Sequence, residues 1–139
     1  ATVHLGEGLV SIISTDPTKP YAWTTVREWE LGGNSLFIKT HPKSHYVYCD
    51  NTINPKKSKV LTIFDINKPE AAPREITFKK KVVHMEFNKS GSEIWVSLWD
   101  KAGEIVVIDD KTLKIKKRIK GLRMPTGKFN VYNTTHDVY

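Results

Sequence analysis

The chain is a succession of short segments in which β-branched and aromatic residues alternate with polar residues or run together. Such segments, bounded by Gly, Pro, Asn and Asp, are typical of β-strands, and almost no stretch has the 3.6-residue period of a helix. The pattern therefore predicts an all-β protein. The strands it predicts are Leu9–Thr15, Ala22–Trp29, Ser35–Lys39, Tyr46–Cys49, Lys59–Phe64, Arg74–Phe78, Val82–Phe87, Glu93–Leu98, Glu104–Ile108, Leu113–Ile119 and Lys128–Tyr132.

The sequence also repeats itself. Ser44–Tyr48 corresponds to Ser92–Val96, and Val60–Asp65 corresponds to Glu104–Asp109. Ser11–Asp16 has the same ending, in which an apolar segment runs into an aspartate. A repeat of about 45 residues that carries four short strands is typical of β-propeller blades.

This repeat predicts how the blades divide the chain. Ser35–Phe78 and Val82–Ile119 are expected to be complete blades, Leu9–Trp29 the last two strands of a preceding blade, and Lys128–Tyr132 the first strand of a following one. A propeller needs about four to eight blades to close. We therefore expect residues 1–139 to be part of a propeller domain, completed by a longer polypeptide or by another molecule. A self-contained β-sandwich of the same strands is the alternative.

Length and composition narrow the possibilities further. The chain has 139 residues, of which 39% are hydrophobic, so it can form one domain with a packed core. No apolar run approaches the roughly 18 residues of a membrane span, and no basic-then-apolar leader opens the sequence, so we expect no membrane contact. A first residue other than Met suggests a processed start. Cys49 is the only cysteine, which excludes an internal disulfide and a Cys-x-x-Cys-His haem attachment.

Few residues suggest catalysis. None of the histidines (His4, His41, His45, His84 and His136) has a metal-ligand spacing, so we predict no metal site. His84 lies in the first strand of a predicted blade, and such strands line the central channel of a propeller. The simpler interpretation of His84 is a half-buried side chain bonded to backbone. Nucleophile elbows, phosphate loops and dinucleotide motifs are absent, so no catalytic residue is predicted in this chain.

Basic residues exceed acidic ones, 22 to 15, which gives a formal net charge of +7. They cluster at Lys56–Lys57, Lys79–Lys81 and Lys114–Arg118. The excess attracts anions or acidic partners. The clusters lack the interleaved Gly-aromatic motif of an RNA-recognition strand, so we expect no nucleic-acid partner.

The closing stretch Pro125–Tyr139 resembles the carboxyl terminus of the cytochrome cd1 nitrite reductases. Four further segments agree: His4–Gly8, Gly33–Ser44, Phe87–Gly91 and Val107–Lys114. The resemblance spans the whole chain. It implies the C-terminal part of an eight-bladed propeller that holds haem d1 in its central channel.

The resemblance also implies an activity. In that family a c-type haem domain passes electrons to haem d1, where nitrite is reduced by one electron to nitric oxide in the periplasm. We accordingly expect nitrite as the substrate, a small periplasmic electron donor and a homodimer for the full-length enzyme. The histidine that ligates the d1 iron and the distal histidines would precede Ala1, as would the haem c domain. This chain alone is therefore expected to be inactive.

By motif match, four residues would contribute to the haem d1 pocket. Phe37 would pack against the macrocycle, and Thr126 and Gly127 would approach it from the last segment. His84 falls where some family members carry glutamine. Two other functions stay open: a relative that handles haem d1 in cofactor maturation or carriage, and a cofactor-free β-repeat module whose basic surface binds an acidic protein.

Overall fold

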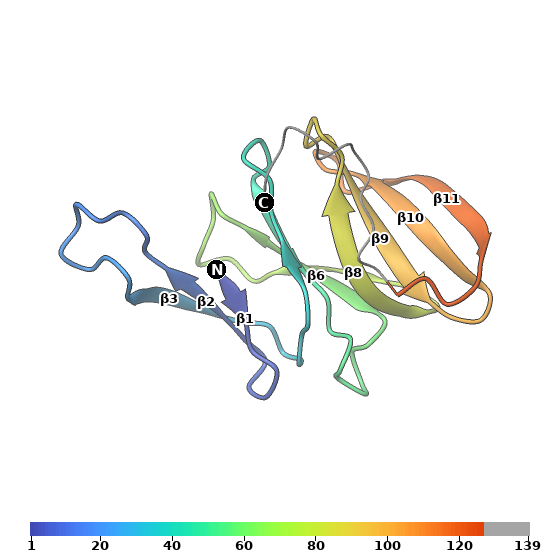
Figure 1. The fold of residues 1–139 in the computed structure, drawn as a ribbon, viewed down its shortest axis with the longest axis horizontal. Helices are drawn as coiled ribbons and strands as arrows, with labels where there is room; N and C mark the ends of the chain where they lie inside the picture. The colour runs from blue at the N-terminus through green and yellow to red at the C-terminus, as the bar shows by residue number, and fades with distance from the viewer. Residues whose placement is uncertain (127–139) are drawn as a thin grey trace.

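The computed structural model describes residues 1–126 and consists of three antiparallel sheets (Figure 1). The first sheet contains β1 (Thr2–Val3), β2 (Leu9–Ile13) and β3 (Thr25–Glu30). The second contains β4 (Ile38–Lys39), β5 (Tyr46–Cys49), β6 (Val60–Asp65) and β7 (Arg74–Thr77). The third contains β8 (Lys81–Phe87), β9 (Glu93–Trp99), β10 (Gly103–Asp109) and β11 (Ile115–Leu122). In every sheet, neighbours in sequence are neighbours in space. Within residues 1–126 no helix is long and apolar enough to span a membrane.

These sheets confirm the prediction of propeller blades, with three differences in detail. The first sheet has a third strand, because Thr2 and Val3 pair with Ser11 and Val10. The segment predicted as Ser35–Lys39 is a strand only at Ile38–Lys39, because Asp50 binds the backbone just before it. The predicted strand Lys128–Tyr132 lies outside the described residues.

The second sheet is buried on both faces, because it lies between the other two. Alternate side chains of β5 and β6 point to opposite faces of the sheet, so a strand such as Val60–Asp65 is apolar almost throughout. The core toward the first sheet consists of Val10, Trp29, Leu31, Val47, Cys49 and Phe64. The core toward the third sheet includes Tyr48, Leu61, Ile63, Met85, Phe87, Ile94, Val96 and Val106.

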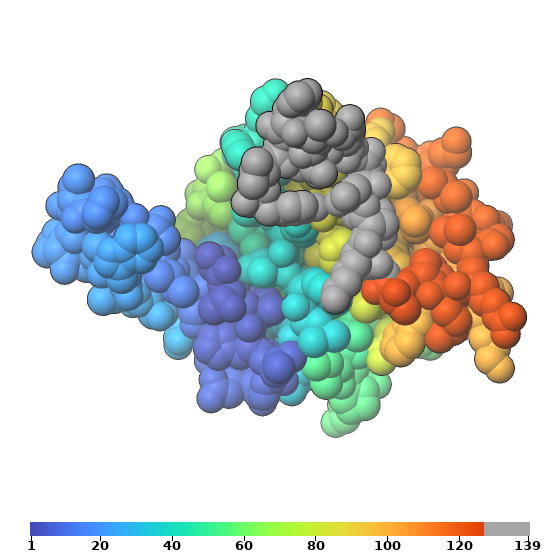
Figure 2. All heavy atoms as spheres, in the orientation of Figure 1, coloured from blue at the N-terminus to red at the C-terminus, as the bar shows by residue number. Residues whose placement is uncertain are grey.

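The connection between β2 and β3 extends away from these packed sheets, at the left of Figure 2. It carries Tyr21, which is 50% exposed, and Trp23, which is 69% exposed. These aromatic side chains add little to the core, so substitutions here are expected to leave the sheets unchanged.

The aspartates of the sequence repeat have a common structural role. Each accepts hydrogen bonds from the backbone two or three residues later, which closes a tight turn after an apolar segment. The donor–acceptor pairs are Thr18 N to Asp16 Oδ1 (3.0 Å), Asn67 N to Asp65 Oδ1 (3.0 Å) and Thr112 N to Asp109 Oδ1 (2.8 Å). The side-chain and backbone bonds from Thr112 lower the pKa of Asp109. The repeat therefore encodes turns rather than acid–base chemistry.

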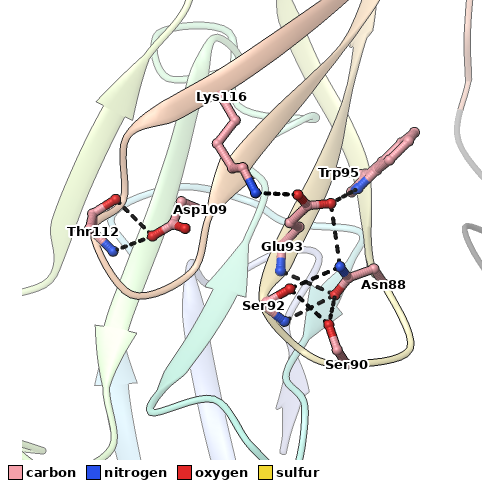
Figure 3. Close-up of polar contacts among 8 residues, drawn as sticks. All are labelled: Asn88, Ser90, Ser92, Glu93, Trp95, Asp109, Thr112 and Lys116. Carbon is pink, nitrogen blue, oxygen red and sulfur yellow. Dashed lines mark hydrogen bonds and ion pairs between the residues drawn. The ribbon is translucent and has the colours of Figure 1, made fainter.

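A second polar cluster ties the β8–β9 turn to β11 (Figure 3). Asn88 Oδ1 accepts bonds from the backbone N–H groups of Ser92 (3.0 Å) and Glu93 (3.1 Å). The carboxylate of Glu93 then accepts from Trp95 Nε1 and pairs with Lys116 of β11. The hydrogen bond from Lys116 lowers the pKa of Glu93. One member of the basic run Lys114–Arg118 thus pairs with a carboxylate of its own blade.

Candidate functional site

Two of the predicted site residues lie in contact. Phe37 directly precedes β4 and His84 belongs to β8, and these two strands contact each other across the second and third sheets. The ring centroids of Phe37 and His84 are 4.9 Å apart with an interplanar angle of 79°. This is an edge-to-face arrangement. Two residues that are 47 positions apart in sequence therefore meet where the second and third sheets adjoin. The side chain of His84 is buried and that of Phe37 is half-buried.

A β-bulge positions His84. Val82 pairs with Leu98 and Met85 pairs with Val96, so Val83 and His84 together oppose the single residue Ser97. His84 has a φ of 62°, in the left-handed region, which costs a non-glycine residue about 1–2 kcal/mol. Bulges redirect side chains and are frequent beside functional sites. The bulge thus turns His84 out of the regular alternation of the strand.

Asp50, which the sequence analysis did not single out, organises the same site. It is fully buried. Its Oδ1 accepts hydrogen bonds from Ser35 Oγ (2.8 Å), Leu36 N (2.8 Å) and Phe37 N (3.2 Å). Its Oδ2 accepts from Thr52 Oγ1 (2.7 Å), and the His84 backbone N–H is 3.5 Å away. One carboxylate therefore fixes the backbone at both aromatic residues.

An ion pair extends the site along the same strands. Lys39 Nζ of β4 lies 3.0 Å from Glu86 Oε2 of β8, and Glu86 is buried. The same oxygen is 3.9 Å from His84 Nε2. That separation is too long for a hydrogen bond, so Glu86 and His84 are neighbours without a direct bond. The arrangement places a cation, a carboxylate and an imidazole in a row beside Phe37.

The segment before Thr126 is anchored opposite the bulge. Ser97 Oγ donates a hydrogen bond to the carbonyl oxygen of Pro125 over 2.6 Å. Gly103 leaves room for this proline, because a Cβ there would lie 2.2 Å from Pro125 Cδ. Thr126 itself is exposed. The structure therefore brings the chain at Thr126 close to the strand opposite His84, while the predicted contact of Gly127 falls outside the described residues.

The other histidines do not join this site. His41 packs its ring against Phe87 at 5.4 Å, and its Nδ1 accepts from Lys43 N. His45 is exposed, and His136 lies outside the described residues. Within residues 1–126, no three His, Cys, Asp or Glu side chains gather closely enough to hold a metal ion.

His4 takes part in a set that resembles the serine, histidine and carboxylate of hydrolases. Its Nε2 is 2.8 Å from Ser11 Oγ, and its Nδ1 is 3.2 Å from Glu7 Oε2. Ser11 is buried, however, and lies in the central strand of the first sheet, where it pairs with Thr2 and Glu28. Strand pairing on both sides favours a structural role for this set over nucleophilic attack.

The family resemblance implies haem d1, a flat macrocycle that carries carboxylates. The residues near the bulge fit one side of such a group. Phe37 offers a half-buried aromatic ring, and His84 offers an imidazole that can donate a hydrogen bond. Lys39 supplies a positive charge near them. Cys49 is not part of this surface, since it is buried in the core and burial raises the pKa of its thiol.

Comparison with known proteins gives a consistent result. The family model of the cytochrome D1 heme domain matches residues 1–134. The nitrite reductase of Stutzerimonas stutzeri is 38% identical over 165 aligned residues, which cover 100% of this chain and 30% of that protein. The dihydro-heme d1 dehydrogenase of Pseudomonas aeruginosa is 32% identical over 134 residues, 96% of this chain and 26% of that protein.

A solved structure supports the same fold. Dihydro-heme d1 dehydrogenase NirN in complex with DHE superposes with a TM-score of 0.71 and 25% sequence identity. The match covers 85% of this chain and 24% of that one. The chain thus spans less than a third of the length of each of these relatives.

Proposed function

The chain belongs to the cytochrome D1 heme domain family, and we propose that it forms one arc of the haem d1 channel in an enzyme that reduces nitrite to nitric oxide. The contact between Phe37 and His84 at the neighbouring strands β4 and β8 is the observation that supports this proposal. It places an aromatic ring and an imidazole where blades meet. The identity of 38% with a nitrite reductase favours this activity.

Haem d1, when bound, would supply the one-electron chemistry, and this chain would position it. Phe37 would offer its ring to an apolar part of the macrocycle. His84 would donate a hydrogen bond to a polar substituent, and Lys39 would attract a carboxylate of the cofactor. Asp50 would hold Phe37 and the bulge in place through its buried bonds. Thr126 and Gly127 would complete this side of the pocket.

The remainder of the enzyme is part of the proposal. Because the chain spans 30% of the nitrite reductase that it matches, we assign the other blades, the haem c domain and the catalytic histidines to sequence beyond this chain. The 139 residues would thus be inactive alone. In this proposal the complete enzyme is a periplasmic homodimer that receives electrons from a small donor protein.

The alternative within the family is a protein that handles haem d1 rather than reducing nitrite. The imidazole of His84 favours it, because a titratable group stands where some nitrite reductases carry an uncharged glutamine. A carboxylate oxygen of Glu86 lies 3.9 Å from Nε2 of that ring. Such a pair is suited to moving a proton near the cofactor.

The test has a binding step and an activity step. Haem d1 is titrated into the full chain while its absorption spectrum is recorded. Phe37→Ala is expected to weaken binding by about tenfold or more, the effect of losing one buried aromatic contact. Tyr21→Ala, which removes an exposed aromatic side chain from the β2–β3 connection, is the matched control and should bind like the wild type.

The activity step uses the full-length polypeptide loaded with haem d1. Nitric oxide formation from nitrite supports the reductase, whereas oxidation of a dihydro-haem d1 without nitrite turnover supports the alternative. Absence of any haem d1 binding by the full-length polypeptide would reject both and favour the cofactor-free module.

A further inference from the structure

A second concave site lies between the second and third sheets, away from Phe37 and His84. The cavity has a volume of about 760 Å³. Its walls come from the end of β7, the β7–β8 turn, the β9–β10 turn, the start of β10 and the end of β11. None of the residues that surround the Phe37–His84 contact lines it. A cavity of this volume suits a small ligand.

The walls of this cavity are strongly basic. Among residues 1–126, Glu104 is the only acidic side chain that lines it. The six basic residues are Lys79, Lys80, Lys101, Arg118, Lys120 and Arg123. These residues include parts of two basic clusters that the sequence shows as separate, Lys79–Lys81 and Lys114–Arg118. The fold therefore concentrates charge that is dispersed along the chain.

Glu104 fixes two of the six cations. Its Oε1 lies 3.3 Å from Lys80 Nζ and 3.2 Å from Arg118 Nη1. Lys80 is held further by a bond to the carbonyl oxygen of Ala102. Two positive groups are thus preorganised in the wall. Less side-chain entropy is therefore lost when an anion binds.

The other four cations are not neutralised within the described part of the chain. Lys79, Lys101, Lys120 and Arg123 form no ion pair with a carboxylate of residues 1–126. Like charges that share a cavity repel one another, and a multivalent anion removes that repulsion. Arg and Lys together recognise phosphate well, the first through paired N–H donors and the second as a point charge.

We propose that this cavity binds a small ligand with two or more neighbouring phosphate groups, such as inorganic tripolyphosphate. The concave shape favours a compact anion over an extended nucleic acid. In the described part of the chain, the one aromatic residue in the wall is Phe78, which is buried and cannot stack on bases. The proposal does not depend on haem d1, because none of Phe37, Lys39, Asp50, His84 and Thr126 lines the cavity.

Calorimetric titration of the full chain with sodium tripolyphosphate tests it. One ligand per chain is expected at physiological salt. The double substitution Lys120→Glu and Arg123→Glu should weaken binding by about tenfold or more, since each charged hydrogen bond contributes substantially. Lys68→Glu with Lys111→Glu changes the net charge equally at exposed positions outside the cavity and should stay within about twofold of the wild type.

Further arms identify the ligand. Equal affinity for tripolyphosphate and adenosine triphosphate indicates that the phosphates alone are recognised, whereas tighter binding of the nucleotide identifies a nucleotide ligand. Lys101→Gln, a single change in an exposed turn, provides a second variant if the double substitution unfolds the chain. The proposal would be overturned if tripolyphosphate binding does not saturate. It would also be overturned if the cavity double substitution and the control double substitution lose affinity equally. A short RNA or polyglutamate that binds more tightly than tripolyphosphate would also overturn it.

Discussion

The hydroxyl of Tyr48 donates a hydrogen bond to Oδ1 of Asp110 over 2.7 Å, although 62 residues separate the two in sequence. Tyr48 lies in β5 of the second sheet, and Asp110 follows β10 of the third. The same oxygen accepts a bond from Ser44 Oγ over 2.9 Å. All three residues are buried. Burial, followed by the bond to Asp110, raises the pKa of Tyr48, so its hydroxyl stays a donor. One carboxylate thus joins two blades.

Removal of this donor tests how strongly the blades are joined. Tyr48→Phe should lower the free energy of unfolding by about 1–3 kcal/mol, because Asp110 is left buried with one fewer donor. Tyr46→Phe is the control, since that hydroxyl has no hydrogen bond within the described residues. Urea denaturation compares the two. A smaller loss for Tyr48→Phe than for Tyr46→Phe would show that the bond does not hold the blades.

Asp50→Asn tests the buried carboxylate behind Phe37. The asparagine would place an NH₂ group where a carboxylate oxygen now accepts hydrogen bonds, so this donor would face other donors. The groups that donate to Asp50 belong to Ser35, Leu36, Phe37, Thr52 and His84. We expect a stability loss of about 1–3 kcal/mol and weaker haem d1 binding, measured by denaturation and by absorption titration. Asp65→Asn is the control, because an asparagine can accept the same turn bond from Asn67 N. Unchanged binding in Asp50→Asn would contradict the positioning role.

The fold was predictable from sequence where the pattern extended over several residues. β6 is largely apolar because both of its faces are covered, and Asp65 and Asp109 close the turns that follow their strands. β1 escaped prediction because two residues carry no periodicity. The pattern predicts a strand from Ser35, but Asp50 binds the backbone there and keeps it out of the sheet. The sequence does not show this, because Asp50 is distant along the chain.

The site was less predictable than the fold. The bulge at His84 interrupts a segment whose sequence reads as a regular strand, and only the register against β9 reveals it. An aspartate that follows a strand usually closes a turn, so nothing in the sequence distinguishes Asp50 from Asp65. The family resemblance points to Phe37, and the position of His84 in the first strand of a predicted blade points to His84 as well. The structure adds that their rings are in contact.

The acid stability of the chain should depend on Glu104. Burial raises the pKa of Glu104, but the hydrogen bonds from Arg118 and Lys80 outweigh it and hold the pKa below its usual 4.5. A lowered pKa in the folded state means that the stabilisation is complete above the usual pKa and is lost as the pH falls through the folded value. Urea midpoints recorded from about pH 6 to pH 3 should therefore fall at the acid end.

Glu104→Gln removes the titrating group and should flatten that part of the profile. Glu70→Gln, at an exposed pair with Arg27, serves as the control and should leave the profile unchanged. If Glu104→Gln and the wild type lose stability in parallel as the pH falls, the acid sensitivity arises from other carboxylates. Glu93 is the next to examine, because the hydrogen bond from Lys116 lowers its pKa.

Gly103→Ala should displace the chain at Pro125. The added Cβ would lie 2.2 Å from Pro125 Cδ and 2.9 Å from the carbonyl oxygen of Asp100. A backbone oxygen and a proline ring move only with the chain. We therefore expect the free energy of unfolding to fall by about 1–3 kcal/mol and haem d1 binding through Thr126 to weaken.

Ser97→Ala removes the bond to Pro125 without a clash and should reduce haem d1 binding with a smaller loss of stability. Gly6→Ala, where a Cβ meets no atom within 4 Å, is the control. Wild-type binding in both Gly103→Ala and Ser97→Ala would show that the anchored segment does not reach the cofactor.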